Sequence, residues 1–265
     1  LVEQAMQDGA VGLSTGLIYL PGVFARTEEI VELAKVAARF DGIYASHIRN
    51  EGVEIFSALE ELFRVAREGK IRAEISHLKL SRPSAWGQTQ KVIAALEQAR
   101  AAGLDITHDQ YVYTASSTGL AQLIPEEARE GGLEKFRERL ADPAGKAGIV
   151  AGMKQALRRG GYEDYSYAVI ANCGHDTSLN GRNVVAAAKA KRGSDSLDDQ
   201  IELILEIHQN GGASGVFHGI NEEDLQQFAR HPNTMFASDS GMRRLGEGVP
   251  HPRGYGNNAR ALARY

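Results

Sequence analysis

Two short apolar runs in the first third of the chain each end in a histidine, and these histidines, His47 and His77, lie 30 residues apart. A helical repeat of apolar residues follows each run, so each histidine closes the strand of one βα unit. Residues that end neighbouring parallel strands point into one shared mouth of a barrel. The spacing fits either a (β/α)8 barrel or an open doubly wound sheet.

The first half of the chain alternates strand and helix patterns and predicts a parallel sheet with right-handed crossovers. Strands are expected over residues 9–15, 42–47, 71–77 and 104–109, with helices over about 27–40, 53–68 and 89–102. Thr27 is a suitable N-cap for the first of these helices. Because no Gly-x-Gly-x-x-Gly follows a strand, a dinucleotide site has no support.

The alternation breaks after Tyr113. The next hundred residues read as polar helices and loops, with surface helices over 133–140 and 147–159 and one strand over 166–171. Such a long excursion is typical of an insertion over a barrel mouth. The pattern then resumes with a strand over 215–218, a helix over 221–230 and a strand over 234–239. We therefore expect barrel βα units in 1–116, a helical lid in 117–212 and the last barrel strands in 213–265.

Composition excludes several classes of protein. The net charge of −4 argues against a nucleic-acid partner, and the longest apolar runs are too short to span a membrane. A single cysteine, Cys173, excludes an internal disulfide framework and predicts a reducing, cytoplasmic location. The chain opens and closes on sequences typical of helix interiors, so we expect it to be a fragment of a longer polypeptide.

The strand-end residues predict a metal site. Two imidazoles, from His47 and His77, together with the carboxylate of Asp239 at the end of the last strand, suggest metal-assisted hydrolysis. The alternative interpretation is a pair of core histidines and a turn aspartate before Gly241. The charged residues that directly follow His47, from Arg49 to Glu51, are also typical of a site at the end of a buried strand.

Several other polar residues are weaker candidates. His108 or Asp109 is a further candidate ligand, and Asp109 can equally order its loop. Cys173 is interpreted as a buried thiol rather than a nucleophile. His218 ends a strand and is a weak candidate, whereas His208 and His231 are interpreted as structural or surface residues. Arg253, in the Gly/Pro-rich loop with His251, has the planar fork that clamps a carboxylate.

A set of segments in order along the chain identifies a family resemblance. The segments are Gly12-Leu-Ser-Thr-Gly-Leu-Ile-Tyr19, Tyr44-Ala-Ser-His-Ile-Arg49, Ile75-Ser-His-Leu-Lys79, Asp109-Gln-Tyr-Val-Tyr-Thr-Ala-Ser-Ser-Thr118, Phe236-Ala-Ser-Asp239 and Pro250-His-Pro-Arg-Gly254. Together they resemble the D-aminoacylase (N-acyl-D-amino-acid deacylase) branch of the amidohydrolase superfamily. Each motif alone is weak, whereas the ordered set covers nearly the whole chain.

The resemblance implies an α/β fold, with this chain forming about strands 4–8 of a metal-dependent (β/α)8 TIM barrel and a helical lid. It implies zinc, one or two ions in the full-length enzyme, held by His47 and His77. Asp239 is implied as a metal-site residue and as the catalytic group that activates the hydrolytic water. Substrate-binding roles are implied for Tyr19, Lys79, Tyr111, Ser117 and Arg253, with Arg243 or Arg244 as alternatives to Arg253.

The chain also departs from the family pattern. The family's first-strand His-x-His pair and its metal-bridging cysteine lie upstream of Leu1, and Cys173 does not match that cysteine. Most of the family's β-sandwich domain is missing. An incomplete barrel leaves strand edges unpaired, so self-association through these edges is an expected outcome.

The implied activity is zinc-dependent hydrolysis of the amide bond of N-acyl-D-amino acids. The implied partner is this small-molecule substrate, with no nucleic acid and no membrane. Another amidohydrolase activity, on a D-dipeptide or a cyclic amide, is the nearest alternative. A catalytically incomplete fragment, which only folds or binds, is the alternative from a different class.

Overall fold

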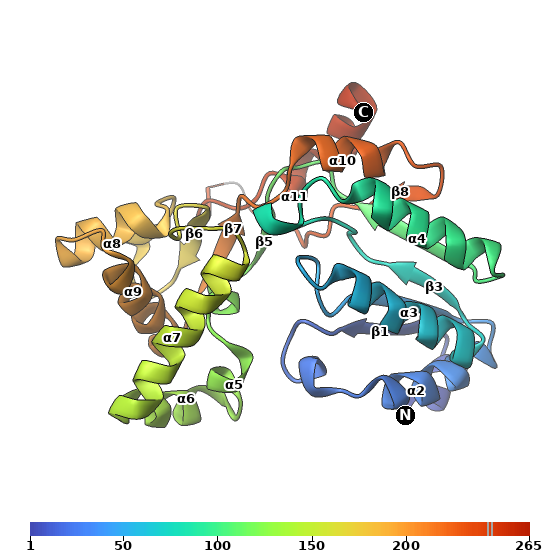
Figure 1. Cartoon of the computed structure of the whole chain (residues 1–265), viewed down its shortest axis with the longest axis horizontal. Coiled ribbons are helices and arrows are strands. Elements are labelled where there is room, and N and C mark those ends of the chain that lie inside the picture. Colours follow the sequence, from blue (N-terminus) through green and yellow to red (C-terminus); the bar gives the residue numbers. More distant parts are fainter. Residues whose placement is uncertain (243, 245) are drawn as a thin grey trace. The chain divides into compact units, whose positions relative to one another are not determined.

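Figure 1 shows a computed structural model of the chain, which describes residues 1–242, 244 and 246–265. The described residues form two compact units. Unit 1 contains Leu1–Val112, Asn221–Asp239 and Gly256–Tyr265, and unit 2 contains Tyr113–Ile220 and Ser240–Tyr255. The predicted boundaries at residues 116 and 212 remain predictions.

Unit 1 is built on a parallel sheet. Its strands, in spatial order, are β1 (Gly12–Gly16), β2 (Ile43–His47), β3 (Arg72–Ile75), β4 (Ile106–Gln110) and β8 (Thr234–Phe236). The predicted parallel sheet is therefore confirmed. In the register between β2 and β3, Ser46 lies opposite Ile75, so the residues that follow these strands emerge at the same edge.

The helices of the βα units pack their apolar faces against this sheet. They are α1 (Val2–Gln7), α2 (Thr27–Ala38), α3 (Ile55–Gly69), α4 (Thr89–Ala101) and α10 (Glu222–Ala229), with short turns η1 (Gly22–Phe24) and η2 (Pro83–Ala85). Helices α2 and α3, drawn in blue near β1 in Figure 1, contact each other, and they bury Ile30, Ala34, Leu59 and Leu62. The chain ends in α11 (Arg253–Arg264).

The prediction that Thr27 caps α2 is wrong, because Arg26 holds the N-cap position and makes no side-chain cap. Thr27 is the first helical residue, and its hydroxyl donates to Glu61 Oε1 at 2.8 Å. This carboxylate also binds Arg49 Nε and Nη2, each at 2.9 Å. The hydroxyl is therefore used between helices rather than at a helix end.

Unit 2 contains an antiparallel sheet. Its strands, in spatial order, are β5 (Ser116–Gly119), β7 (Ala213–Phe217) and β6 (Ala168–Cys173). The prediction that the run ending at His218 resumes the parallel sheet is wrong. A short apolar strand carries no signal for the direction of its partner, and here β7 is paired on both sides by antiparallel strands from the intervening segment.

Helices complete unit 2. They are α5 (Glu126–Arg129), α6 (Gly132–Ala141), α7 (Pro143–Arg159), α8 (Val184–Arg192) and α9 (Leu197–Gln209), with turns η3 (Leu120–Leu123) and η4 (Thr177–Leu179). The N-caps Asp142, Asn183 and Ser196 accept hydrogen bonds from the first turns of α7, α8 and α9. These caps satisfy backbone donors that would otherwise lack partners.

The expected surface helices 133–140 and 147–159 also contribute to a hydrophobic core. Phe136 on α6 and Met153 and Leu157 on α7 are buried in one cluster with residues of α8 and α9. Their predominantly polar composition hides one apolar face on each helix. Among the residues that the structure describes, we find no helical segment with the length and hydropathy of a membrane span.

Candidate functional site

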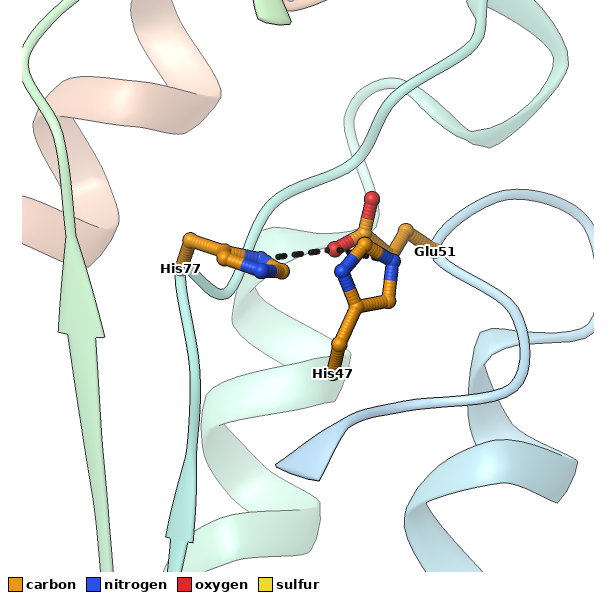
Figure 2. A group of neighbouring side chains, drawn as sticks. All are labelled: His47, Glu51 and His77. Carbon is orange, nitrogen blue, oxygen red and sulfur yellow. Dashed lines mark hydrogen bonds and ion pairs between the residues drawn. The ribbon is translucent and has the colours of Figure 1, made fainter. Parts of the chain in front are cut away.

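The histidines that end neighbouring strands meet at the carboxyl edge of the parallel sheet. His47 is the last residue of β2, and His77 follows β3 by two residues. Their ring centroids are 4.3 Å apart with the rings at 71°, and Figure 2 shows both rings directed toward the same point. The prediction that the imidazoles of His47 and His77 lie close together is therefore confirmed.

The backbone fixes His77 in an uncommon conformation. Its φ of 45° is left-handed, a region that histidine enters more often than most residues but still at a cost in energy. The His77 N–H donates to Asp109 Oδ1 at 2.7 Å, and the Leu78 N–H donates to the Asp109 carbonyl at 2.9 Å. Asp109 thus orders this loop, as one of its two predicted roles requires.

Glu51 is the third member of the group. Its Oε1 lies 2.5 Å from Lys79 Nζ, 3.0 Å from His77 Nδ1 and 3.7 Å from His47 Nε2. Figure 2 shows the carboxylate between the two rings, reached from the loop that follows β2. The sequence predicts a site at the charged segment that includes Glu51, but it assigns no role to Glu51, because spacing alone does not show how that loop folds back.

Burial controls the charges of this group. Burial is the main reason that the pKa of His47 falls to about 3; the Glu51 carboxylate opposes this fall and the Lys79 ammonium adds to it. Burial alone would raise the pKa of Glu51, but Lys79 and the two histidines lower it well below its usual range. At neutral pH the group therefore presents a neutral His47 imidazole beside an ionised Glu51 carboxylate.

The donor set fits a metal ion. One ligand atom from each of His47, Glu51 and His77 lies within 4.8 Å of the others. His47 Nε2 is buried and has no hydrogen-bond partner among the described residues, so a metal bound to this nitrogen would satisfy a buried polar atom. Imidazole nitrogens with a carboxylate oxygen suit Zn²⁺.

Aromatic rings and an ammonium surround the histidines. The Tyr19 ring meets His47 edge-on at 4.9 Å, and the Tyr111 ring centroid lies 6.5 Å from that of His77. Lys79 is buried, and its ammonium contacts Glu51 Oε1, the His77 carbonyl at 2.9 Å and His77 Nδ1 at 2.8 Å. The Lys79 ammonium therefore makes these contacts with Glu51 and His77 within the chain.

Asp239 lies three residues beyond β8 and outside the group of His47, Glu51 and His77. Its side chain is exposed, and its φ of 47° is left-handed. Non-glycine residues in this conformation are concentrated at active sites and turns. Its catalytic and metal-site roles remain predictions.

Two neighbouring carboxyl groups, those of Glu74 and Asp109, lie within unit 1. Burial and the neighbouring Asp109 carboxylate raise the pKa of Glu74 to about 8, so Glu74 is protonated at neutral pH. Ser76 Oγ donates to Glu74 Oε2 at 3.3 Å. Asp109 therefore lies beside Glu74 and also accepts a hydrogen bond from the loop that carries His77.

Ser117 and Arg253 lie together in unit 2. They line a cavity of about 270 Å³, along with His251 and Arg244. Arg253 Nη2 donates to the Ser117 carbonyl at 3.2 Å, and His251 Nε2 contacts the Ala115 carbonyl at 2.8 Å. The alternative Arg243 lies outside the described residues.

The remaining candidates take structural positions. Cys173 is buried, and burial raises the pKa of its thiol, which agrees with an inert side chain. His108 is buried with Nε2 at 2.7 Å from Thr234 Oγ1, and His231 Nε2 contacts Glu97 at 3.0 Å. His208 packs edge-on against Phe136, and His218 is exposed.

Comparisons with known proteins extend these observations. No model of a known protein family matches the sequence. The whole chain is 32% identical to a D-aminoacylase of Alcaligenes xylosoxydans xylosoxydans, of which it covers 45%. A stretch of 126 residues, 48% of the chain, is 42% identical to an N-acyl-D-glutamate deacylase of the same organism, of which it covers 25%. The chain thus spans about half or less of the length of these relatives.

Solved structures agree with the sequence comparison. The fold matches a D-aminoacylase crystal structure described as defining a novel subset of amidohydrolases, with a TM-score of 0.69, 29% identity, and coverage of 97% of this chain and 44% of that one. It also matches an N-acyl-D-glutamate deacylase from Bordetella bronchiseptica, solved with zinc and a phosphonate inhibitor. That TM-score is 0.71 at 28% identity, with coverage of 99% and 47%.

The parallel sheet with histidines and a carboxylate at its carboxyl edge defines an α/β protein with a candidate metal centre. The relatives specify the comparison further: over its whole length the chain is similar to D-aminoacylases, one of which is described as defining a novel subset of amidohydrolases. Another solved D-aminoacylase is described by its binuclear metal centre, with activation by one metal and attenuation by a second.

Proposed function

We propose that the protein carrying this chain hydrolyses the amide bond of N-acyl-D-amino acids at a zinc centre. The observation that carries the proposal is the buried group of His47, Glu51 and His77 at the carboxyl edge of the sheet. The relatives support the substrate class, because they are described as a D-aminoacylase and as deacylases of N-acyl-D-glutamate and N-acyl-D-aspartate. One or two zinc ions are proposed, as relatives carry zinc and a binuclear centre.

We further propose that unit 1 supplies about strands 4–8 of a (β/α)8 barrel and that residues 117–212 serve as a lid. The order and direction of β1, β2, β3 and β4 support the barrel assignment. A cytoplasmic location is proposed on the single cysteine of the sequence.

His47 and His77 would hold the metal in this proposal. When bound, zinc lowers the pKa of a water molecule and polarises the scissile carbonyl. Asp239 accepts the proton of the attacking water as the new C–O bond forms, and it donates that proton to the amine nitrogen as the C–N bond breaks. The Tyr19 hydroxyl donates a hydrogen bond to the carbonyl oxygen as negative charge develops there.

Recognition of the substrate carboxylate is assigned first to Arg253, because its guanidinium matches a carboxylate with two parallel hydrogen bonds. Its position in a cavity with Ser117 supports this assignment. Tyr111 is proposed to contact the substrate beside His77. Lys79 is a weaker anchor than the family resemblance implies, because it must release Glu51 or His77 before it can bind a second carboxylate.

Hydrolysis by the protein that carries this chain tests the proposal. N-acetyl-D-glutamate, N-acetyl-D-aspartate and N-acetyl-D-methionine serve as substrates, with their L-enantiomers, a D-dipeptide and a cyclic amide for comparison. We expect release of the D-amino acid, loss of turnover in Asp239→Asn with zinc content retained, and unchanged activity in the exposed control Asp8→Asn.

Three results would contradict parts of the proposal. Turnover confined to the dipeptide or the cyclic amide would favour another amidohydrolase activity. Zinc content near zero together with no hydrolysis would favour a protein that only folds or binds. Activity retained in Asp239→Asn would remove Asp239 from the mechanism.

A further inference from the structure

The carboxylate of Glu51 joins two strand-end loops through a single oxygen. Oε1 accepts from Lys79 Nζ at 2.5 Å and lies 3.0 Å from His77 Nδ1, while all three side chains are buried. The backbone of Glu51 is fixed as well, because its carbonyl accepts from the Ser81 N–H at 2.9 Å. Glu51, on the loop after β2, therefore contacts the loop after β3 through both its side chain and its backbone carbonyl.

Whether His77 Nδ1 donates or accepts a hydrogen bond depends on the ring tautomer. Nδ1 can accept a hydrogen bond from Lys79 Nζ at 2.8 Å or donate one to Glu51 Oε1 at 3.0 Å, but it cannot do both. A metal bound through Nε2 needs the lone pair of that nitrogen, which places the ring proton on Nδ1. Nδ1 then donates its hydrogen bond to Glu51 Oε1, which lies 3.0 Å away.

Direct ligation of a metal by the same oxygen is disfavoured. The Lys79 ammonium, 2.5 Å from Oε1, already occupies a cation position on that oxygen. A metal on Oε1 would displace this ammonium and leave it buried without its counter-charge, at a large cost. Histidines that bind metals commonly donate their other ring N–H to a carboxylate, which fixes the ring and its tautomer.

We propose that Glu51 is a positioning residue of the metal centre: it accepts the Nδ1 proton of His77 and so presents Nε2 to the metal, while Lys79 balances its charge. This inference rests on the proposed function, since it assumes that His77 is a metal ligand. It assigns to Glu51 an effect on metal affinity that operates through His77 rather than through a bond to the metal.

Zn²⁺ affinity, measured by competition with a chromophoric chelator, tests the assignment on the full chain. We expect Glu51→Gln to bind Zn²⁺ about 10–100-fold more weakly, the range found when carboxylate partners of histidine ligands are removed. The exposed Glu60→Gln on α3 is the matched control and should bind as the unmodified chain does. Equal Zn²⁺ affinity in Glu51→Gln and the unmodified chain would overturn the assignment.

A second variant covers the case in which Glu51→Gln alone fails to fold. Removing one partner of a buried ion pair is strongly destabilising, whereas replacing both is often tolerated. The double variant Lys79→Met/Glu51→Gln replaces both partners and so removes the contact with His77 without leaving a buried unpaired charge. It should bind Zn²⁺ about 10–100-fold more weakly than the unmodified chain. Equal affinities in these two would overturn the proposal and leave Glu51 a structural role alone.

The visible spectrum of bound Co²⁺ separates positioning from direct ligation. At saturating Co²⁺, we expect the d–d bands of Glu51→Gln and the unmodified chain to coincide, because the ligand set is unchanged. A shift of the bands would identify Glu51 as a ligand and overturn the positioning role. Failure of the unmodified chain to bind Zn²⁺ would instead contradict the proposed function itself.

Discussion

Asp224 holds the start of α4 against α10, and its loss should destabilise unit 1 measurably. The carboxylate is 2% exposed and accepts from the Gly87 N–H at 2.9 Å and from the Thr89 hydroxyl at 2.6 Å. A hydrogen bond to a charged group contributes about 1.5–3 kcal/mol. Water can replace the carboxylate at exposed Gly87 but not at Thr89, which is 1% exposed.

From these contacts, Asp224→Ala should lower the free energy of unfolding of unit 1 by about 3 kcal/mol, and Asp224→Asn by about half as much. The exposed neighbour Glu223→Ala removes a charge from the same helix turn and should cost below about 0.5 kcal/mol. The double variant Asp224→Ala/Thr89→Val should cost about 1.5 kcal/mol less than the sum of the single variants, because it leaves no buried hydroxyl without an acceptor.

Urea unfolding followed by tryptophan fluorescence is the assay. Trp86 is the single tryptophan of the sequence and precedes Gly87, so its emission reports on this junction. A loss below about 1 kcal/mol in Asp224→Ala, or additive effects in the double variant, would refute the reasoning that these buried hydrogen bonds stabilise the junction.

Two further predictions concern the loops and the pH dependence of unit 1. Arg49→Lys should lower the free energy of unfolding by about 2 kcal/mol, because a lysine cannot reproduce the paired bonds to Glu61. Arg49 also donates to the carbonyls of Val23 and Ala25, so limited proteolysis should cleave residues 17–26 faster in this variant, and an unchanged cleavage rate would contradict this. Burial and Asp109 raise the pKa of Glu74 from 4.5 to about 8. Between these two pH values the folded state keeps a proton that the unfolded state releases. The free energy of unfolding should therefore fall as the pH rises from 4.5 to about 8. Glu74→Gln should flatten that decline in urea unfolding at pH 5, 6.5 and 8, and an equally steep decline would argue against the raised pKa.

The sequence was sufficient to predict the parallel sheet and the meeting of His47 and His77, because both follow from strand-end geometry. Parallel strands release their next residues at one edge, so two histidines that end adjacent strands must approach each other. Glu51 could not be assigned in this way, since its position depends on a loop that folds back to Ser81 and Lys79.

The limits of prediction in unit 2 have a different cause. The pairing of β7 spans about a hundred residues of sequence to β5 and roughly half as many to β6, and a five-residue apolar strand has no local signal for either partner. The core formed by Phe136 and Met153 was hidden because helices that bury one narrow face have a mostly polar composition.

The central claim is that His47 and His77 form a metal site, and the zinc content of the purified 265-residue chain tests it most directly. The double variant His47→Ala/His77→Ala is compared with His175→Ala/His218→Ala, which removes the same number of imidazoles from exposed positions. We predict that the unmodified chain and the exposed-site variant retain zinc after dialysis and that His47→Ala/His77→Ala loses it. Equal zinc in all three proteins, or zinc in none, would contradict the account.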